Sequence, residues 1–163
     1  MDTNMNDRIV LYWFSGTGNT FAVTRAMADV FEAAGKSVEL VAMEDGPPAE
    51  SSPGTTVGLA VPVACGNTYD LCWEFIMALP DGGGAGCFLV DTLAAHSGGL
   101  LGPVRDVVTA KGYQPLGARE IRMASNFLTK PKSPEKVQRI NVAGLDAARG
   151  FAKELLDGSA TWR

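Results

Sequence analysis

The chain has 163 residues, of which 46% are hydrophobic and 20% are charged, and its formal net charge at pH 7 is -4. This length suits one domain with its own hydrophobic core, and this composition excludes an intrinsically disordered chain. The net negative charge, without a basic stripe, argues against binding to nucleic acid, because contacts with the charged backbone of a nucleic acid need clustered lysine and arginine. It leaves room for a partner protein with a basic face, although many ordinary soluble proteins are mildly acidic.

The cysteines and the start of the chain bear on its location. Cys65, Cys72 and Cys87 form no C-x-x-C pair, and an odd number is poor material for a disulfide framework, so we expect reduced thiols. The first seven residues are polar and lack the basic-then-apolar order of a secretion signal. No apolar run approaches the length needed to cross a membrane. The sequence therefore predicts a soluble, cytoplasmic protein that makes no membrane contact.

The first predicted elements are a strand, a helix and a second strand. Residues 9–14 form an unbroken apolar run before a glycine-rich turn, which is typical of a strand buried on both faces of a parallel sheet. An apolar stripe predicts a helix over about 20–34, with Gly35 as its stop. Residues 37–42 alternate in part and predict a strand, and the Gly, Pro and Ser of 45–53 predict a loop.

The rest of the chain continues this alternation. The predicted elements are strands over 56–61, 87–91 and 113–123, helices over 68–79, 100–110 and 134–156, and loops over 81–86 and 92–99. A bend is expected in the last helix near Gly144. One helix follows most strands, which indicates an α/β fold with an open parallel sheet and helices on both faces. No repeat or long linker divides the chain, so we predict a single domain over 1–163 with its core at about 8–156.

The segment between the first strand and the first helix carries the clearest chemical signal. It reads Ser15-Gly16-Thr17-Gly18-Asn19-Thr20. The glycines let the backbone curve tightly, the hydroxyl and amide side chains supply neutral donors, and the helix that follows offers free N–H groups. Together these features predict a binding site for a phosphate monoester. A simple helix cap is the alternative interpretation, but a cap needs only one such residue.

Other sites of similar composition do not fit this sequence. The segment has no Lys or Arg, whereas the phosphate loop of nucleoside triphosphatases uses a lysine to reach the outer phosphates. Phe21 stands where the G-x-G-x-x-G pattern needs its third glycine, so a dinucleotide site is not expected. Serine-hydrolase and metal-site patterns are missing too, and the single histidine, His96, cannot build a His-rich site.

The phosphate segment resembles the signature of the flavodoxin family, in which Thr or Ser, any residue, Thr, Gly, any residue and Thr follow one another. More narrowly, the run Tyr12-Trp13-Phe14-Ser15-Gly16-Thr17-Gly18-Asn19-Thr20 is similar to the flavodoxin module that precedes two ferredoxin motifs in fused proteins of anaerobes. Two further segments resemble the family more weakly, namely Val61-Pro62-Val63 and Met123-Ala124-Ser125-Asn126-Phe127. The resemblance covers about residues 8–156 and implies a flavodoxin-like, three-layer, doubly wound fold, with five parallel strands in the order 2-1-3-4-5.

The resemblance also implies FMN as the cofactor. Its phosphate would lie in the loop formed by Ser15, Gly16, Thr17, Gly18, Asn19 and Thr20, and its ring between the loops after the third and fourth strands. The residues expected to bind it there are Pro62, Val63, Ala64, Cys65, Gly66 and Asn67 in the first loop and Thr92, Leu93, Ala94, His96, Gly98 and Gly99 in the second. A backbone group at Gly66 is the candidate to face N5 of the flavin.

Several side chains near these loops have two interpretations. His96 is either a solvent-facing loop residue or a group that packs against the flavin. Cys65 is interpreted first as a small buried thiol, with an approach to the flavin ring as the alternative, and Asp91 is interpreted first as a strand-end or cap residue. Tyr69 and Trp73 have helical spacing, which favours the core, although Tyr69 stands close enough to the helix start to flank the ring.

The predicted function is that of an FMN-binding carrier that passes electrons between redox protein partners, with no catalytic residue and no metal of its own. Three cysteines cannot supply the four thiolates of an iron–sulfur cluster, so an iron–sulfur partner would be a separate protein. One alternative is an FMN-dependent oxidoreductase that reduces a small molecule such as a quinone or tetrapyrrole. Another is a flavin-free binding module with the same fold. We expect a monomer or a homodimer.

Overall fold

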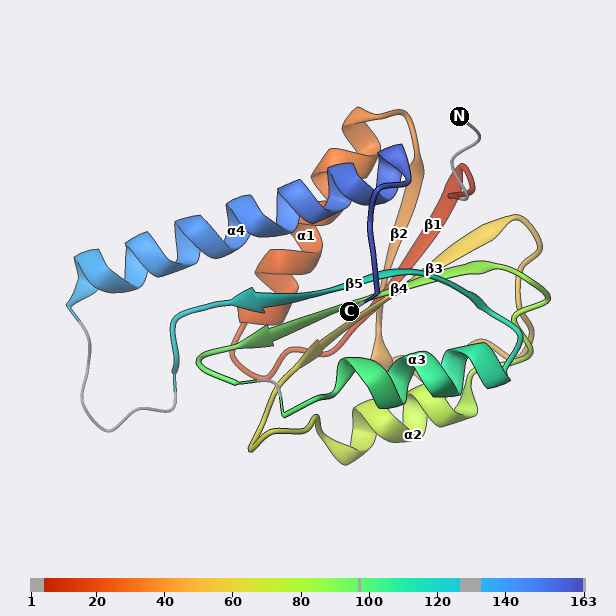
Figure 1. Cartoon of the computed structure of the whole chain (residues 1–163), viewed down its shortest axis with the longest axis horizontal. Coiled ribbons are helices and arrows are strands. Elements are labelled where there is room, and N and C mark those ends of the chain that lie inside the picture. Colours follow the sequence, from red (N-terminus) through yellow and green to blue (C-terminus); the bar gives the residue numbers. More distant parts are fainter. Residues whose placement is uncertain (1–4, 97, 127–132, 163) are drawn as a thin grey trace.

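The computed structural model describes residues 5–96, 98–126 and 133–162. The elements along the chain are β1 (Arg8–Trp13), α1 (Asn19–Ala33), β2 (Ser37–Ala42), the short 3-10 helix η1 (Met43–Asp45), β3 (Thr55–Pro62), α2 (Asp70–Ala78), β4 (Gly86–Leu93), α3 (Leu101–Ala110), β5 (Gln114–Arg122) and α4 (Pro134–Asp157) (Figure 1). The predicted strands and helices are confirmed, with ends that differ by at most two residues. The helix η1 was not predicted.

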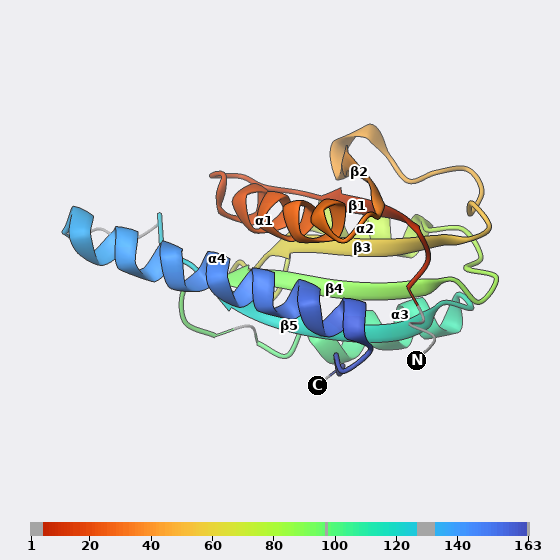
Figure 2. The same cartoon turned by 90° about the horizontal axis from the view of Figure 1, so that it is seen from above.

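The five strands form one parallel sheet in the order β2-β1-β3-β4-β5, which confirms the predicted fold class. The helices α1 and α4 cover one face, and α2 and α3 cover the other (Figures 1 and 2). The strand order changes direction between β1 and β3. In open α/β sheets, ligands bind beyond the carboxyl ends of the strands at such a switch point.

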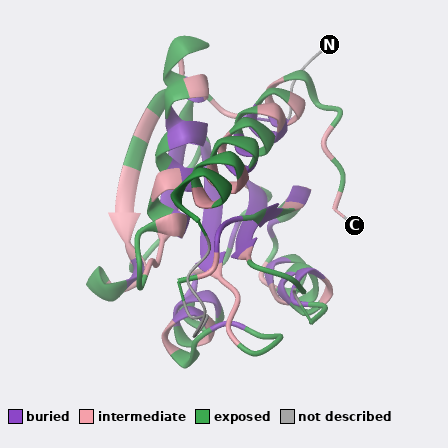
Figure 3. Ribbon diagram, turned by 90° about the vertical axis from the view of Figure 1, so that its left-hand side faces the viewer, coloured by how far each residue is buried: buried purple, intermediate pink, exposed green. Residues whose placement is uncertain are grey.

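Each face of the sheet packs against its own apolar core. Side chains alternate along β1, so Ile9 and Leu11 pack with α1 and α4, whereas Val10 and Tyr12 pack with α2 and α3. The central strands β3 and β4 are buried along nearly their whole length (Figure 3). Burial on both faces is the physical reason for the unbroken apolar runs in the sequence.

The helix α4 holds the end of β5 in place. Gly144, where a bend was expected, is a buried residue of this helix, and a Cβ atom there would lie 2.5 Å from the backbone oxygen of Arg122. Its missing side chain therefore lets α4 lie close to the strand. In addition, the Asn141 side-chain oxygen accepts a hydrogen bond from the Ala124 N–H at 2.9 Å. These contacts position the segment that follows β5.

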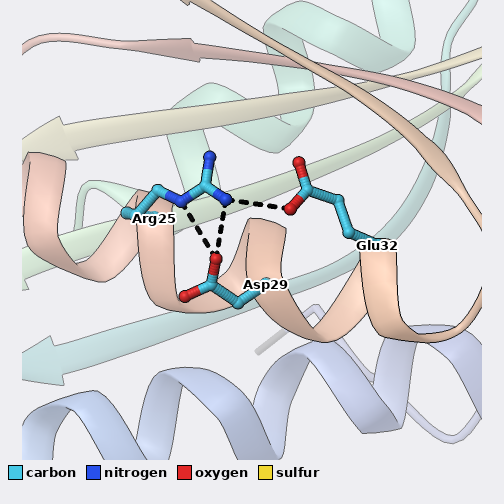
Figure 4. Close-up of polar contacts among 3 residues, drawn as sticks. All are labelled: Arg25, Asp29 and Glu32. Atoms are coloured by element: carbon cyan, nitrogen blue, oxygen red, sulfur yellow. Dashed lines mark hydrogen bonds and ion pairs between the residues drawn. The ribbon is translucent and has the colours of Figure 1, made fainter.

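The solvent side of α1 carries a small network of ion pairs. The Arg25 guanidinium lies 2.8 Å from Asp29 and 2.9 Å from Glu32 (Figure 4). All three side chains are exposed, so solvent screens their attraction. We interpret this network as local support for the helix.

The segment after α4 packs against the free edge of β5. The Ala118 N–H donates a hydrogen bond to the Thr161 oxygen at 3.0 Å, and the Trp162 indole N–H donates to the Leu101 oxygen at 2.8 Å. The first bond satisfies part of an edge strand that would otherwise be open to pairing, and the second ties the segment to α3. Among the helices in the described ranges, none combines the length and apolar character that a membrane span requires.

Candidate functional site

A cavity of about 210 Å³ opens at the carboxyl ends of β1, β3, β4 and β5. It is lined by Ser15, Gly16, Thr17, Asn19, Thr20, Pro62, Val63, Tyr69, Thr92, Leu93, Ala94, Met123, Ala124, Ser125 and Asn126. This is where the switch point of the sheet predicts a ligand. Within the described ranges, no three His, Cys, Asp or Glu side chains are grouped so that they could hold a metal ion.

The predicted phosphate loop wraps around the start of α1. The Ser15 hydroxyl oxygen accepts a hydrogen bond from the Gly18 N–H at 3.0 Å, which closes the loop into a tight turn. Gly18 has a φ of 95°, a conformation that disfavours any residue with a side chain. A Cβ atom at Gly16 or Gly18 would meet no atom within 4 Å, so both glycines border open space. All the predicted loop residues except Gly18 line the cavity.

The electrostatics of this end of α1 suit an anion. The helix begins at Asn19 with no side-chain cap and no acidic residue in its first turn, so its N–H groups present a positive end. Among the described residues that line the cavity, none is Lys or Arg. Of these residues, backbone N–H groups and neutral side chains would hold an anion there. The residues present therefore fit the phosphate monoester of FMN better than a triphosphate.

The end of β4 braces the start of α1. Thr92 was expected in a loop, but it pairs with Ile121 of β5 and belongs to the strand, as does Leu93. The Thr92 Oγ1 atom lies 2.7 Å from Oγ1 of the buried Thr20. The predicted strand end was too early because Thr92 was grouped with the small residues that follow it, whereas sheet pairing extends the strand through Leu93.

The segment after β5 lines the cavity and was missing from the predicted binding residues. The Asn126 side-chain N–H donates to the Thr17 hydroxyl at 2.8 Å, and the Asn19 side-chain N–H donates to the Ala124 oxygen at 2.9 Å. These two bonds join the phosphate loop to the segment after β5. The sequence did contain a signal for this segment, namely its resemblance to the family at Met123–Asn126. The next residue, 127, is outside the described residues.

The segment after β3 contributes its first residues to the cavity and then turns away. Pro62 and Val63 line the cavity, whereas residues 64–67 form a two-residue turn in which Ala64 and Asn67 bond each other's backbones. Cys65 lies at the tip with a φ of 51° and is exposed. The expectation of a buried thiol is therefore wrong, because a residue at the tip of a tight turn has no core to enter.

The segment after β4 also lines the cavity with only some of its residues. Ala94 lines the cavity, but His96 is exposed and, like Gly98 and Gly99, is not among the lining residues. A Cβ atom at Gly98 would lie 1.9 Å from the backbone oxygen of Gly66, so the two predicted ring loops touch at these glycines. A role in cofactor binding for these residues and for 64–67 stays a prediction.

Tyr69 is the aromatic residue that lines the cavity among the described residues, in line with the alternative interpretation of its position. It is 47% exposed, lines the cavity just before α2, and meets Phe14 edge to face with their ring centres 5.4 Å apart. The favoured expectation of a core position is wrong for Tyr69, since it precedes the helix instead of lying on its buried face. Trp73 is partly buried and donates its indole N–H to the Asn67 side chain at 2.8 Å.

Asp91 is a buried charge-bearing residue close to the site. It lies inside β4, caps no helix, and its two carboxyl oxygens have no hydrogen-bond partner among the described residues. Burial, together with the nearby charge of Glu120, raises the pKa of Asp91 to about 7. The interpretation as a strand-end or cap residue is therefore wrong.

Comparison with known proteins adds the fold relationship. No model of a known protein family matches this chain, and no curated protein matches it. Among solved structures, the two-electron reduced flavodoxin of Megasphaera elsdenii is 22% identical, with 86% of this chain and 98% of that chain covered and a TM-score of 0.61.

Two further structures give a similar result. Oxidised Flavodoxin 2 of Bacillus cereus is 14% identical, with 92% and 98% of the two chains covered and a TM-score of 0.64. RosB, solved with bound 8-demethyl-8-formylriboflavin-5'-phosphate, is 10% identical, with 93% of this chain and 78% of that chain covered and a TM-score of 0.64. Together with the strand order, these likenesses show that the chain has the flavodoxin-like fold.

Proposed function

We propose that this protein binds FMN in the cavity and carries electrons between redox partners. The observation that carries the proposal is the uncapped start of α1 behind the Ser15–Thr20 loop, where neutral donors and helix N–H groups converge. FMN, when bound, supplies one- and two-electron chemistry. The protein's own residues hold the phosphate at this loop. We also propose that this chain is particularly similar to the flavodoxin module of the fused flavodoxin–ferredoxin proteins of anaerobes.

The remaining lining residues suit a flavin ring. Pro62, Val63 and Leu93 supply apolar edges, and Tyr69 supplies an aromatic face. Among the described lining residues, Tyr69 is the one aromatic side chain. An uncovered second face of the ring would admit a flat substrate, which favours the FMN-dependent oxidoreductase as the second candidate function.

A visible absorption spectrum tests the cofactor assignment. Purified protein is mixed with FMN, the excess is removed, and the retained flavin is measured. We expect about one flavin per chain in the wild type and a large loss in the double variant Ser15→Ala, Thr17→Ala, with Ser52→Ala as a surface control. Riboflavin, which lacks the phosphate, should bind much more weakly. Wild-type protein that retains no FMN would contradict the proposal and favour the flavin-free binding module.

The charge distribution supports a redox partner with a basic surface. No Lys or Arg occurs between Lys36 and Arg105, whereas eight Asp and Glu residues lie in that interval. Four of them, Glu44, Asp45, Asp70 and Glu74, are exposed on η1 and α2, which pack side by side. No ion pair neutralises these four among the described residues. A positively charged partner would be attracted to this side of the molecule.

The same side also carries an apolar stripe that begins at the cavity. Trp73 and Met77 are four residues apart on one face of α2, and Tyr69 precedes the helix at the cavity end. Met77 is 58% exposed, and Tyr69 is 47% exposed. An apolar centre with a charged rim is the usual pattern of a transient protein interface. We infer that a redox partner, such as a separate iron–sulfur protein, docks over α2.

Electron transfer to a cationic acceptor protein tests this surface. The rate at which the reduced, FMN-loaded protein reduces cytochrome c is followed at low and high ionic strength. We expect the Asp70→Lys, Glu74→Lys variant to react several-fold more slowly at low salt, because it loses electrostatic steering. The variant Asp146→Lys, on the exposed side of α4, is the control. Equal rates for both variants would argue against docking over α2.

A further inference from the structure

A carboxyl group lies buried beneath the cavity. Asp91 is 0% exposed, and within the described part of the chain neither of its oxygens forms a hydrogen bond. A buried carboxylate with no donor is unfavourable, so the folded protein favours the protonated, uncharged acid. A small change in nearby charge can then decide whether this group holds its proton.

The strand places this group directly below the lining of the cavity. Leu89 packs with α2 and α3 and Val90 with α1 and α4, so by alternation Asp91 faces the α2 and α3 side. Leu93, two residues further on the same side, lines the cavity, so Asp91 lies roughly 7 Å deeper along the strand. Thr92, between them, points to the opposite face and bonds Thr20. Asp91 itself is not among the lining residues.

The surroundings of Asp91 contain one influential charge. Glu120 lies opposite it on β5, and its negative charge adds to burial in favouring the protonated acid. Val61 is its apolar neighbour on β3. Other titratable or charged side chains on this side of the sheet include Tyr12 on β1, Cys87 on β4, Tyr113 before β5, Arg122 on β5, Arg105 and Asp106 on α3, Asp70, Cys72 and Glu74 on α2, and His96 after β4. Arg105 and Asp106 pair with each other on the surface.

We propose that Asp91 is a proton-linked buried acid. It takes up a proton when negative charge enters the cavity and releases it when that charge leaves. The proton moves from solvent to a carboxylate oxygen and forms an O–H bond. No electron passes through Asp91; an external reductant supplies any electron that the cofactor gains. The proposal rests on the proposed function, because the entering charge is that of the FMN phosphate and of the added electron. Like charges about 10 Å apart in a protein change a proton equilibrium by about tenfold.

Carbon NMR of the aspartate carboxyl groups tests the proposal without any turnover. Protein labelled at aspartate Cγ is titrated with acid and base, with and without FMN, and Asp91→Asn identifies the Asp91 signal. We expect a titration midpoint near neutral pH that rises by up to about one pH unit, or tenfold in proton affinity, when FMN binds. An unchanged midpoint, while absorbance shows bound flavin, would overturn the proposal.

Failure of the proposed function is distinguishable from failure of this inference. If FMN does not bind, the proposed function fails. The titration is then repeated with inorganic phosphate as the entering charge. If the Asp91 titration midpoint still does not change, the inference is overturned too. Should Asp91→Asn fail to fold, Glu120→Gln removes the neighbouring charge from an exposed position. It should lower the Asp91 midpoint, and no shift would overturn the proposal.

A second measurement separates the proton link from a purely structural role. The reduction potential of bound FMN is recorded between pH 6 and 8 for the wild type and Asp91→Asn. We expect the potential to fall more steeply with pH in the wild type than in the variant, because only the wild type takes up the extra proton. Parallel pH profiles for the two proteins would overturn the proposal.

Discussion

The Oγ1 atoms of Thr20 and Thr92 lie 2.7 Å apart, although the two residues are 72 positions apart in the chain. Both side chains are buried, and the pair joins the first turn of α1 to the end of β4. A second hydrogen bond lies next to this pair, since the Thr24 hydroxyl donates to the Thr20 backbone oxygen at 2.8 Å. The start of α1, where we propose that the phosphate binds, is thus anchored to the centre of the sheet.

Removing this hydroxyl pair should destabilise the fold. In Thr92→Val, which keeps the side-chain shape, we expect the free energy of unfolding to fall by about 1–3 kcal/mol, because the buried Thr20 hydroxyl loses its partner. Urea unfolding measures this change. The double variant Thr20→Val, Thr92→Val should recover part of the loss, and Thr109→Val on the exposed side of α3 is the control. A Thr92→Val protein as stable as the wild type would contradict the prediction.

The bond from Asn126 to Thr17 should matter for ligand binding more than for stability. In Asn126→Ala we expect the affinity for FMN to fall by about three- to tenfold, because the phosphate loop loses one of its braces. Quenching of flavin fluorescence gives the dissociation constant. Gln138→Ala, at an exposed position of α4, serves as the control. Unchanged affinity would mean that the segment after β5 does not hold the loop.

The contact between Gly66 and Gly98 predicts an unequal response of two neighbouring glycines. Gly98 and Gly99 both have positive φ, but a Cβ atom at Gly98 would meet the Gly66 backbone, whereas one at Gly99 would meet no atom within 4 Å. We expect Gly99→Ala to cost about 1 kcal/mol of stability through its backbone conformation. Gly98→Ala should cost about 1–3 kcal/mol more, because the loops must move apart. Equal unfolding midpoints in urea would contradict this contact.

The buried acid predicts an unusual dependence of stability on pH. The pKa of Asp91 is raised from 3.8 to about 7 in the folded protein, so between these values the folded chain holds a proton that the unfolded chain has lost. Its contribution therefore falls as pH rises from about 4 to 7, by a total on the order of 4 kcal/mol, and is then constant. Urea unfolding of the wild type and Asp91→Asn across this range measures the difference. A constant difference between them would contradict the raised pKa.

Much of the fold could be predicted because its signals are local. The apolar run at 9–14, the stripe over 20–34 and the glycines at the turns each reflect the conformation of a few consecutive residues. The phosphate loop belongs to the same class, since a strand, a tight turn and a helix start follow one another without interruption. Alternation of strands and helices then leaves few topologies open.

The sequence by itself therefore determined the order of the elements and the tight turn between β1 and α1. Tertiary structure alone decided which distant segments complete the site. Asn126 meets Thr17 across 109 residues, and Gly98 meets Gly66 across a second loop. It also decided that Asp91 has no hydrogen-bond partner among the described residues, because the surroundings of a buried carboxyl come from neighbouring strands and helices. Local conformation follows from neighbours in the chain, whereas these contacts follow from how the sheet brings the ends of its strands together.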